Sequence, residues 1–228
     1  SWMSFKSAVI TFPGSNCDRD ALVYLKILTN GEVFNIWHEE TSLPNVDLVI
    51  IPGGFSFGDY LRSGAMAAKS NIISDLINHS EKGGYILGIC NGFQILSEIG
   101  LLKGALIQNN KLKFLGKNCF IKKKHKNNFN KSINHDQILE IPVAHNEGNF
   151  YCDSDNLKYL HDNELIAFEY CEGKYSNSEA NINGSIDNVA GITNENKNIL
   201  GMMPHPERAF QDFHKSQDGK LILDSILA

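Results

Sequence analysis

Cysteine is scarce in this sequence, and its spacing disfavours two structural uses of the residue. Five cysteines occur among the 228 residues, an odd number, and no two of them form a Cys-x-x-Cys pair. A disulfide framework and a structural zinc site both need more closely patterned cysteines. We therefore expect reduced thiols, a cytoplasmic location and no bound metal.

Long apolar runs and an excess of basic charge are also missing. The longest apolar runs, such as residues 46–51, have the length of a strand, whereas a membrane span needs about 20 apolar residues. The net charge is −5 and the pI about 5.9, and no stretch interleaves aromatic and basic residues as single-strand binders do. We expect no signal peptide and no membrane or nucleic-acid partner, and a small polar substrate fits this charge better.

The pattern that is present is an alternation of short apolar runs with helical stretches. It predicts an α/β fold with a mostly parallel sheet and crossover helices on both faces. The length and the 42% hydrophobic content are enough for one compact domain, which we expect over residues 3–228, reading Ser1 and Trp2 as a cloning remnant. The predicted strands are 7–12, 33–37, 46–51 and 85–89, and the predicted helices are 18–29, 65–78 and 91–99.

The second half has a different texture. Its shorter β-like runs predict extra strands, either added to the sheet or in a small β layer. Residues 122–136 are rich in Lys, Asn and His without apolar periodicity, which predicts a solvated hairpin loop without chemistry. The predicted strands are 114–121, 138–144, 165–170, 188–193 and 199–203, followed by a helix over 217–227.

Cys90 is the candidate nucleophile. It is the centre of a Gly-x-Cys-x-Gly pentapeptide, residues 88–92, between a predicted strand and a predicted helix. This is the pattern of a nucleophile elbow, where a tight turn exposes the side chain. The positive end of the following helix favours the reactive thiolate. The alternative is a buried, inert cysteine, and Cys17 alone shares a strand-loop-helix setting, without the flanking glycines.

His205 is the candidate base, and Glu207 its orienter. Pro206 pushes the preceding residue into an extended conformation, in which residues two apart point to the same side. Glu207 can therefore reach the His205 ring, fix its tautomer and leave the other ring nitrogen for a proton. The alternative is a surface histidine in a proline-rich turn. His145 is a rival base, with a carboxylate two residues on, although we favour a role in substrate binding for it.

Attack on a carbonyl creates an oxyanion, which needs two backbone donors. The amides of Asn91 and Gly54 are the candidates. Gly53 and Gly54 follow a predicted buried strand, and glycine permits the close approach that such a site demands. A plain tight turn is the alternative for these two glycines.

Together, these motifs resemble the class I glutamine amidotransferases, which use a Cys-His-Glu triad. Longer stretches are similar to the glutaminase subunits of phosphoribosylformylglycinamidine synthases, enzymes of purine synthesis, and the similarity runs from Met3 over essentially the whole chain. The motifs are Gly-Ile-Cys-Asn-Gly-Phe-Gln at 88–94, Pro-His-Pro-Glu-Arg at 204–208, Phe-Pro-Gly-Ser-Asn-Cys-Asp at 12–18, Pro-Gly-Gly-Phe-Ser-Phe-Gly-Asp-Tyr-Leu-Arg-Ser-Gly at 52–64 and Ala-His-Asn-Glu-Gly-Asn-Phe at 144–150.

This resemblance implies a flavodoxin-like fold, a catalytic triad and contacts to glutamine. The implied triad is Cys90, His205 and Glu207, and the implied substrate-binding residues are Gly53, Gln94, His145 and Asn149. One departure is visible: the family pattern usually has a glycine after the histidine of the Ala-His motif, where this chain has Asn146. Asparagine tolerates positive φ better than most residues.

The resemblance also implies partners. Similar enzymes release ammonia from L-glutamine and pass it to a synthetase site that uses ATP and Mg²⁺. No Gly-x-x-x-x-Gly-Lys-Ser/Thr loop occurs in this chain, so ATP is expected on a large synthetase subunit, accompanied by a small accessory subunit. The Phe55–Arg62 stretch is the expected contact with them. A cysteine-elbow peptidase or stress protein, or a non-catalytic scaffolding subunit, are the competing interpretations.

Overall fold

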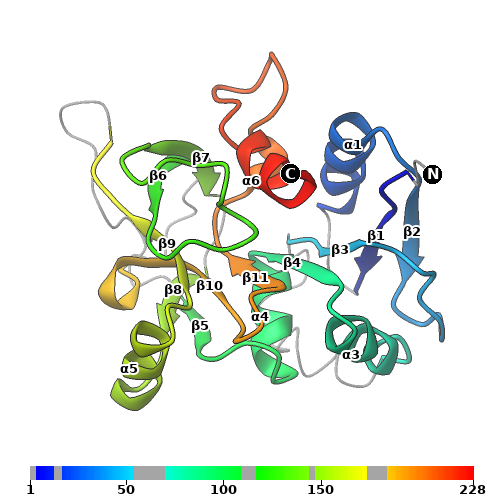
Figure 1. The fold of residues 1–228 in the computed structure, drawn as a ribbon, viewed down its shortest axis with the longest axis horizontal. Helices are drawn as coiled ribbons and strands as arrows, with labels where there is room; N and C mark the ends of the chain where they lie inside the picture. The colour runs from blue at the N-terminus through cyan, green and yellow to red at the C-terminus, as the bar shows by residue number, and fades with distance from the viewer. Residues whose placement is uncertain (1–3, 13–16, 54–69, 109–116, 144–146, 174–183) are drawn as a thin grey trace.

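The computed structural model describes residues 4–12, 17–53, 70–108, 117–143, 147–173 and 184–228, and nine strands of these residues form one sheet. Five neighbouring strands run parallel and the remaining four are antiparallel. The sheet therefore divides into a parallel half and an antiparallel half (Figure 1). The order is β2 (Val33–Trp37), β1 (Ser7–Thr11), β3 (Leu48–Ile51), β4 (Tyr85–Ile89), β11 (Ile199–Met202), β10 (Val189–Thr193), β9 (Ile166–Tyr170), β6 (Lys117–Lys123) and β7 (Leu139–Val143).

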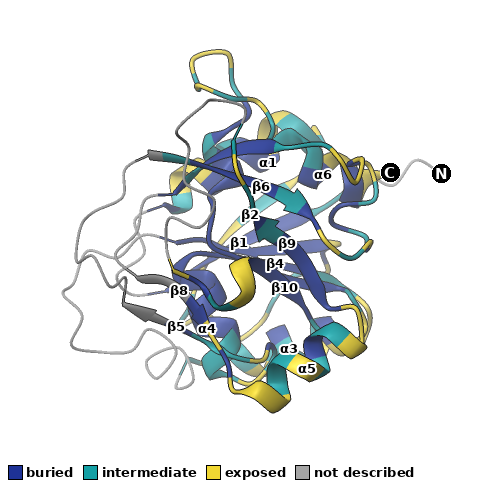
Figure 2. Cartoon of the chain, turned by 90° about the vertical axis from the view of Figure 1, so that its left-hand side faces the viewer, coloured by how far each residue is buried: buried dark blue, intermediate teal, exposed yellow. Residues whose placement is uncertain are grey.

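Helices cover both faces of the parallel half. In both views α1 (Asp18–Thr29) and α6 (Lys220–Leu227) lie above the sheet, while α3 (Ile73–Glu81) and α4 (Asn91–Glu98) lie below it (Figures 1 and 2). A separate two-stranded sheet pairs β5 (Ala105–Gln108) with β8 (Glu147–Tyr151), and α5 (Ser154–Asp162) follows it. Two short 3-10 turns, η1 (Ile186–Asn188) and η2 (Pro206–Arg208), complete the described elements.

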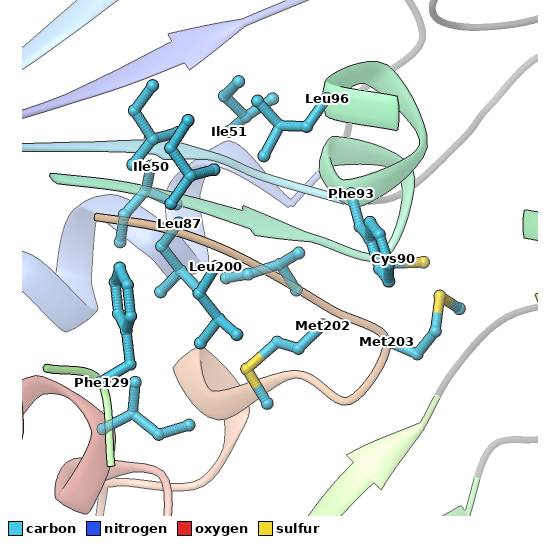
Figure 3. Packing of buried hydrophobic residues seen from close by; sticks show 14 of the residues in the cluster. Ile50, Ile51, Leu87, Cys90, Phe93, Leu96, Phe129, Leu200, Met202 and Met203 are labelled. Atoms are coloured by element: carbon cyan, nitrogen blue, oxygen red, sulfur yellow. The ribbon is translucent and has the colours of Figure 1, made fainter. Parts of the chain in front are cut away.

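The core lies between the sheet and its helices. All residues of β1, β3 and β11 are buried, as expected for strands covered on both faces. Leu87 and Leu200 come from neighbouring strands, and Ile50 and Phe129 pack in the same cluster (Figure 3). Burying such aliphatic side chains contributes roughly 1.5–3 kcal/mol each, so this cluster holds the strands that carry the site.

Most predicted elements are observed within a few residues, and three match at both ends: 18–29, 33–37 and 85–89. The helix predicted over 65–78 is wrong at both ends as far as the described residues, from 70 onward, show. Residues 70–72 form a turn, and the helix runs from Ile73 to Glu81. It stops where Gly83 adopts φ +87°, a conformation that favours glycine. Two strands and one α-helix were not predicted: β5, β8 and α5.

The prediction for residues 122–136 is partly wrong. The segment does connect an antiparallel pair, β6 and β7, but it is not solvated throughout. Lys122 and Lys123 still belong to β6, and Phe129 is fully buried, with its ring 5.8 Å from that of Tyr85. The Asn130 side chain is also fully buried and bonds to backbone groups of Asn127, His125 and Ala167. A polar side chain can be buried in this loop because backbone groups satisfy its hydrogen bonds.

Candidate active site

Cys90 lies where β4 passes directly into α4 (Figure 3). Its backbone has φ 57° and ψ −111°, a conformation that is rare for a residue with a side chain and that persists only when its surroundings impose it. Two backbone bonds do so: the Cys90 N–H donates to the Met202 carbonyl at 2.8 Å, and the Gln94 N–H donates to the Cys90 carbonyl at 3.2 Å. The result is a strained turn with the cysteine at its apex.

Both glycines of the pentapeptide are required by contacts around this turn. A Cβ on Gly92 would lie 1.9 Å from the carbonyl oxygen of Ile51 in the neighbouring strand. A Cβ on Gly88 would lie 2.5 Å from Leu96 Cδ1 and 2.8 Å from the Gly92 carbonyl oxygen. Since neither backbone contact can yield, the helix reaches this position against β3 and β4 only with glycine at both sites.

His205 and Glu207 form a buried pair just beyond β11. The Nδ1 atom of His205 lies 2.6 Å from Oε1 of Glu207, and each residue is 1% exposed. His205 has φ −103° and ψ 89° before Pro206, which is outside the helical region as the proline demands. The backbone N–H of His205 donates to the Pro142 carbonyl at 2.8 Å. Among the described residues, Nε2 of His205 has no hydrogen-bond partner, so this nitrogen is the one available for a proton.

Gly53 brings the cysteine and the histidine together. A Cβ placed on Gly53 would lie 2.7 Å from Cys90 Cβ and 3.2 Å from His205 Cε1. Both side chains therefore flank one small space beside Gly53. The sheet explains why they meet: β4 and β11 are parallel neighbours, with Ile89 opposite Met202, and the carboxyl ends of parallel strands lie at the same edge.

Two further predicted residues lie on α4. Asn91 is the first residue of the helix and is buried, and its Nδ2 has no partner in the described structure. Its backbone N–H belongs to the first helical turn, where no carbonyl of the helix can receive it. Gln94 is 8% exposed, and its Nε2 donates to Oε1 of Glu98 at 2.6 Å.

Some of the predicted site falls outside the described residues. Gly54, His145 and Asn146 are among these, as is the Phe55–Arg62 stretch. Asn149 is placed in β8, with its backbone opposite Ile107 of β5. The structure therefore brings together Cys90, His205, Glu207 and Gly53, with Asn91 and Gln94 on the adjoining helix.

A cluster beside Glu207 had no predicted role. Arg208 Nη2 donates to the Cys17 sulfur at 2.7 Å, and Arg208 Nε donates to Asp20 Oδ2 at 3.3 Å. Burial raises the pKa of the Cys17 thiol to about 11, although the Arg208 cation opposes this shift. Cys17 is thus a protonated thiol at neutral pH. The position of Arg208 directly after Glu207 was the available signal that it lies near the site.

Over the described ranges, no group of three or more His, Cys, Asp or Glu side chains is arranged to hold a metal ion. No helix of those ranges is long and apolar enough to cross a membrane.

One family of known proteins matches almost the whole chain. Residues 4–221 match the CobB/CobQ-like glutamine amidotransferase domain. The chain belongs to this glutamine amidotransferase family. The predicted family is thereby confirmed, and the family match disfavours the two competing enzyme classes, a cysteine-elbow peptidase and a stress protein.

Relatives of this amidotransferase are similar over nearly their whole length. The phosphoribosylformylglycinamidine synthase subunit PurQ of Pelagibacter ubique is 47% identical, covering 97% of each chain. The PurQ subunit of Leptospira interrogans serovar copenhageni is 49% identical, covering 97% of this chain and 99% of that one. In the solved structure of PurLQS from Thermotoga maritima, a chain with 38% identity superposes with a TM-score of 0.84, covering 99% of this chain and 98% of the other. The predicted fold class is confirmed.

Proposed function

We propose that this amidotransferase is the glutaminase subunit of a phosphoribosylformylglycinamidine synthase, with Cys90, His205 and Glu207 as its catalytic triad. The observation that carries the assignment of the triad is the packing around Gly53. A cysteine held in a strained elbow and a histidine paired to a buried glutamate flank the same glycine. Relatives that bear the PurQ name at 47–49% identity support the choice of enzyme.

The proposed reaction begins with attack of the Cys90 sulfur on the side-chain carboxamide carbon of L-glutamine. His205 Nε2 takes the thiol proton, while Glu207 holds the Nδ1 side of the ring and stabilises the imidazolium. The C–N bond then breaks, and the proton leaves with the nitrogen as ammonia. Water adds to the resulting thioester, with His205 again as the base, and the C–S bond breaks to give glutamate and the Cys90 thiol.

The oxyanion of each tetrahedral intermediate needs donors already in place. We assign them to the backbone amides of Asn91 and Gly54, and the substrate contacts to Gly53, Gln94, His145 and Asn149. Asn91 is supported by its position as the first residue of α4, where its N–H is available and the helix dipole favours negative charge. Removing one such donor typically costs a hundredfold or more, about 3 kcal/mol.

The ammonia has a proposed use on partner subunits. In the complete reaction, formylglycinamide ribonucleotide, glutamine, ATP and water give formylglycinamidine ribonucleotide, glutamate, ADP and phosphate. We assign ATP and Mg²⁺ to a large synthetase subunit, accompanied by a small accessory subunit, in the cytoplasm, and no cofactor to this chain. The structural relative supports such an assembly, since its solved structure is that of PurLQS.

Ammonia release from glutamine, measured with and without the synthetase subunits, tests the assignment. We expect the Cys90→Ala variant to lose glutamine-dependent synthesis by at least about a thousandfold and to retain synthesis from free ammonia. Retention of full glutamine-dependent activity by Cys90→Ala would overturn the role of the cysteine. Loss of both activities with normal assembly would also count against the assignment, because Cys90 would then be needed for the synthesis step itself and not only for ammonia release.

A further inference from the structure

Gln94 and Glu98 form a side-chain pair on α4, one helical turn apart. Nε2 of Gln94 donates to Oε1 of Glu98 at 2.6 Å. Residues four apart lie on the same helical face, and Gln94 is itself four residues after Cys90, whose carbonyl accepts the Gln94 N–H. The carboxamide of Gln94 and the carboxylate of Glu98 therefore lie along one side of α4, in the turns that follow Cys90.

This pair decides which way round the Gln94 carboxamide lies. An ionised carboxylate only accepts hydrogen bonds, so it must face the NH₂ group and not the carbonyl oxygen. The carboxamide oxygen is consequently turned away from Glu98. This oxygen is buried and has no hydrogen-bond partner in the described part of the chain. Leaving a buried carbonyl unsatisfied is unfavourable, which indicates that a ligand supplies the missing donor.

We propose that Glu98 is a positioning residue that presents the Gln94 carboxamide oxygen to an N–H donor of the amino acid substrate. This inference rests on the proposed glutaminase function and adds a specificity element to it. A ligand that places an ammonium or amide N–H against Gln94 is bound, whereas one that places a carboxylate oxygen there meets a second acceptor and is repelled. Glu98 touches no reacting atom and acts only through Gln94.

Labelling of Cys90 separates this role from a purely structural one. The glutamine analogue 6-diazo-5-oxo-L-norleucine needs the amino acid pocket, whereas iodoacetamide needs only the thiolate. We expect Glu98→Ala to slow labelling by the analogue roughly tenfold, the factor for about 1.4 kcal/mol of lost binding. The iodoacetamide rate should stay as in the wild type. In the assembled complex, KM for glutamine should rise by a similar factor while kcat changes less than threefold.

A reversed pair supplies the rescue. Gln94→Glu alone places two carboxylates together and should weaken binding of the analogue. Gln94→Glu combined with Glu98→Gln restores one donor and one acceptor and again leaves an acceptor oxygen at position 94, so labelling should recover to within about threefold of the wild type. Glu81→Gln, at the exposed end of α3, removes the same charge from another helix end and serves as the matched control.

The outcomes distinguish the two proposals. Wild type that, even in the assembled complex, neither reacts with the analogue at Cys90 nor releases ammonia would overturn the glutaminase function itself. Normal wild-type labelling with unchanged rates in Glu98→Ala would overturn only the positioning role. An equal loss of iodoacetamide and analogue labelling would also overturn it, since the defect would then lie in the thiolate or the fold.

Discussion

His205 and Glu207 are joined through a 2.6 Å contact between Nδ1 and Oε1, and both are almost completely withdrawn from solvent. A buried ion-pairing geometry of this kind constrains the ring strongly, because neither side chain has water to replace its partner. His205 and Glu207 directly flank Pro206 in the sequence, so the orientation of the proposed base is set locally by a neighbouring side chain.

Replacing Glu207 by glutamine should remove the carboxylate that fixes the tautomer and the orientation of the His205 ring. The neutral amide does not stabilise an imidazolium, and its NH₂ group can donate to Nδ1 and leave the proton on Nε2, where a base must be free. We expect kcat for glutamine hydrolysis to fall roughly a hundredfold or more. Steady-state ammonia release measures this, with the exposed Glu195→Gln as control. Unchanged kcat in Glu207→Gln would exclude it as the orienting residue.

Gly92→Ala should destabilise the whole fold and not only the site. Its new Cβ would lie 1.9 Å from the Ile51 carbonyl oxygen, so α4 must shift away from β3. We expect a loss of about 3 kcal/mol in the free energy of unfolding, from urea denaturation. Gly83→Ala meets no atom within 4 Å and only disturbs a residue at φ +87°, which costs about 1 kcal/mol. Equal losses in the two variants would contradict the close approach.

The Cys17 thiol should make the free energy of unfolding decrease at alkaline pH. Its pKa is raised by burial from 9.0 to about 11, so the unfolded chain releases the thiol proton first. This contribution to stability is complete below about pH 9 and is lost as the pH rises through about 11. The variant Cys17→Ser keeps an acceptor for Arg208 and lacks the titrating thiol.

Urea unfolding midpoints of the wild type and Cys17→Ser measure this effect. The difference between them should be constant up to about pH 9 and then shift in favour of the serine variant. Burial also raises the pKa of Cys119, but that thiol is present in both proteins and cancels. Parallel curves up to about pH 11 would show that Cys17 titrates normally.

Asn130→Ala tests the packed loop between β6 and β7. The side chain is fully buried and bonds to three backbone groups. Alanine removes all three bonds and the acceptor of the Asn127 N–H, while the carbonyls of His125 and Ala167 each keep one other donor. We expect a loss of roughly 2–4 kcal/mol in the free energy of unfolding. Asn134→Ala, on the exposed part of the same loop, should change it by less than about 0.5 kcal/mol. Similar values for the two variants would mean that the loop is only loosely packed.

The sequence predicted the parallel half of the fold because its signals are local. Strand 85–89 is a continuous apolar run, and helix 18–29 is bounded by Asp18 and by Asn30, which adopts φ 51°. The triad motifs are local in the same way: Pro206 sets the conformation of His205, and the two glycines set the elbow. Their meeting through Gly53 depends on sheet order, which no single segment encodes.

The missed elements have weaker or non-local signals. Helix α5 is polar and has Leu160 as its one fully buried residue, so its apolar periodicity is weak. Its best signal was Asp153, whose side chain accepts the Asn156 N–H at 2.7 Å as an N-cap. Strands β5 and β8 are stabilised by each other, far apart in the chain. The burial of Phe129 and Asn130 depends on strands that contact them from elsewhere, so composition alone suggested a solvated loop.

The insertion of β11 beside β4 has a consequence for synthesis of the protein. Strand β4, which leads into the proposed nucleophile, is made well before β11, which leads to His205, and β11 separates β4 from β10 in the sheet. A growing chain on the ribosome therefore has Cys90 but no base, and the edge of β4 that β11 will cover is unpaired. Until β11 pairs with β4, the chain lacks its proposed base and is prone to wrong strand pairing, so a single pairing event both completes the proposed site and covers the open edge of β4.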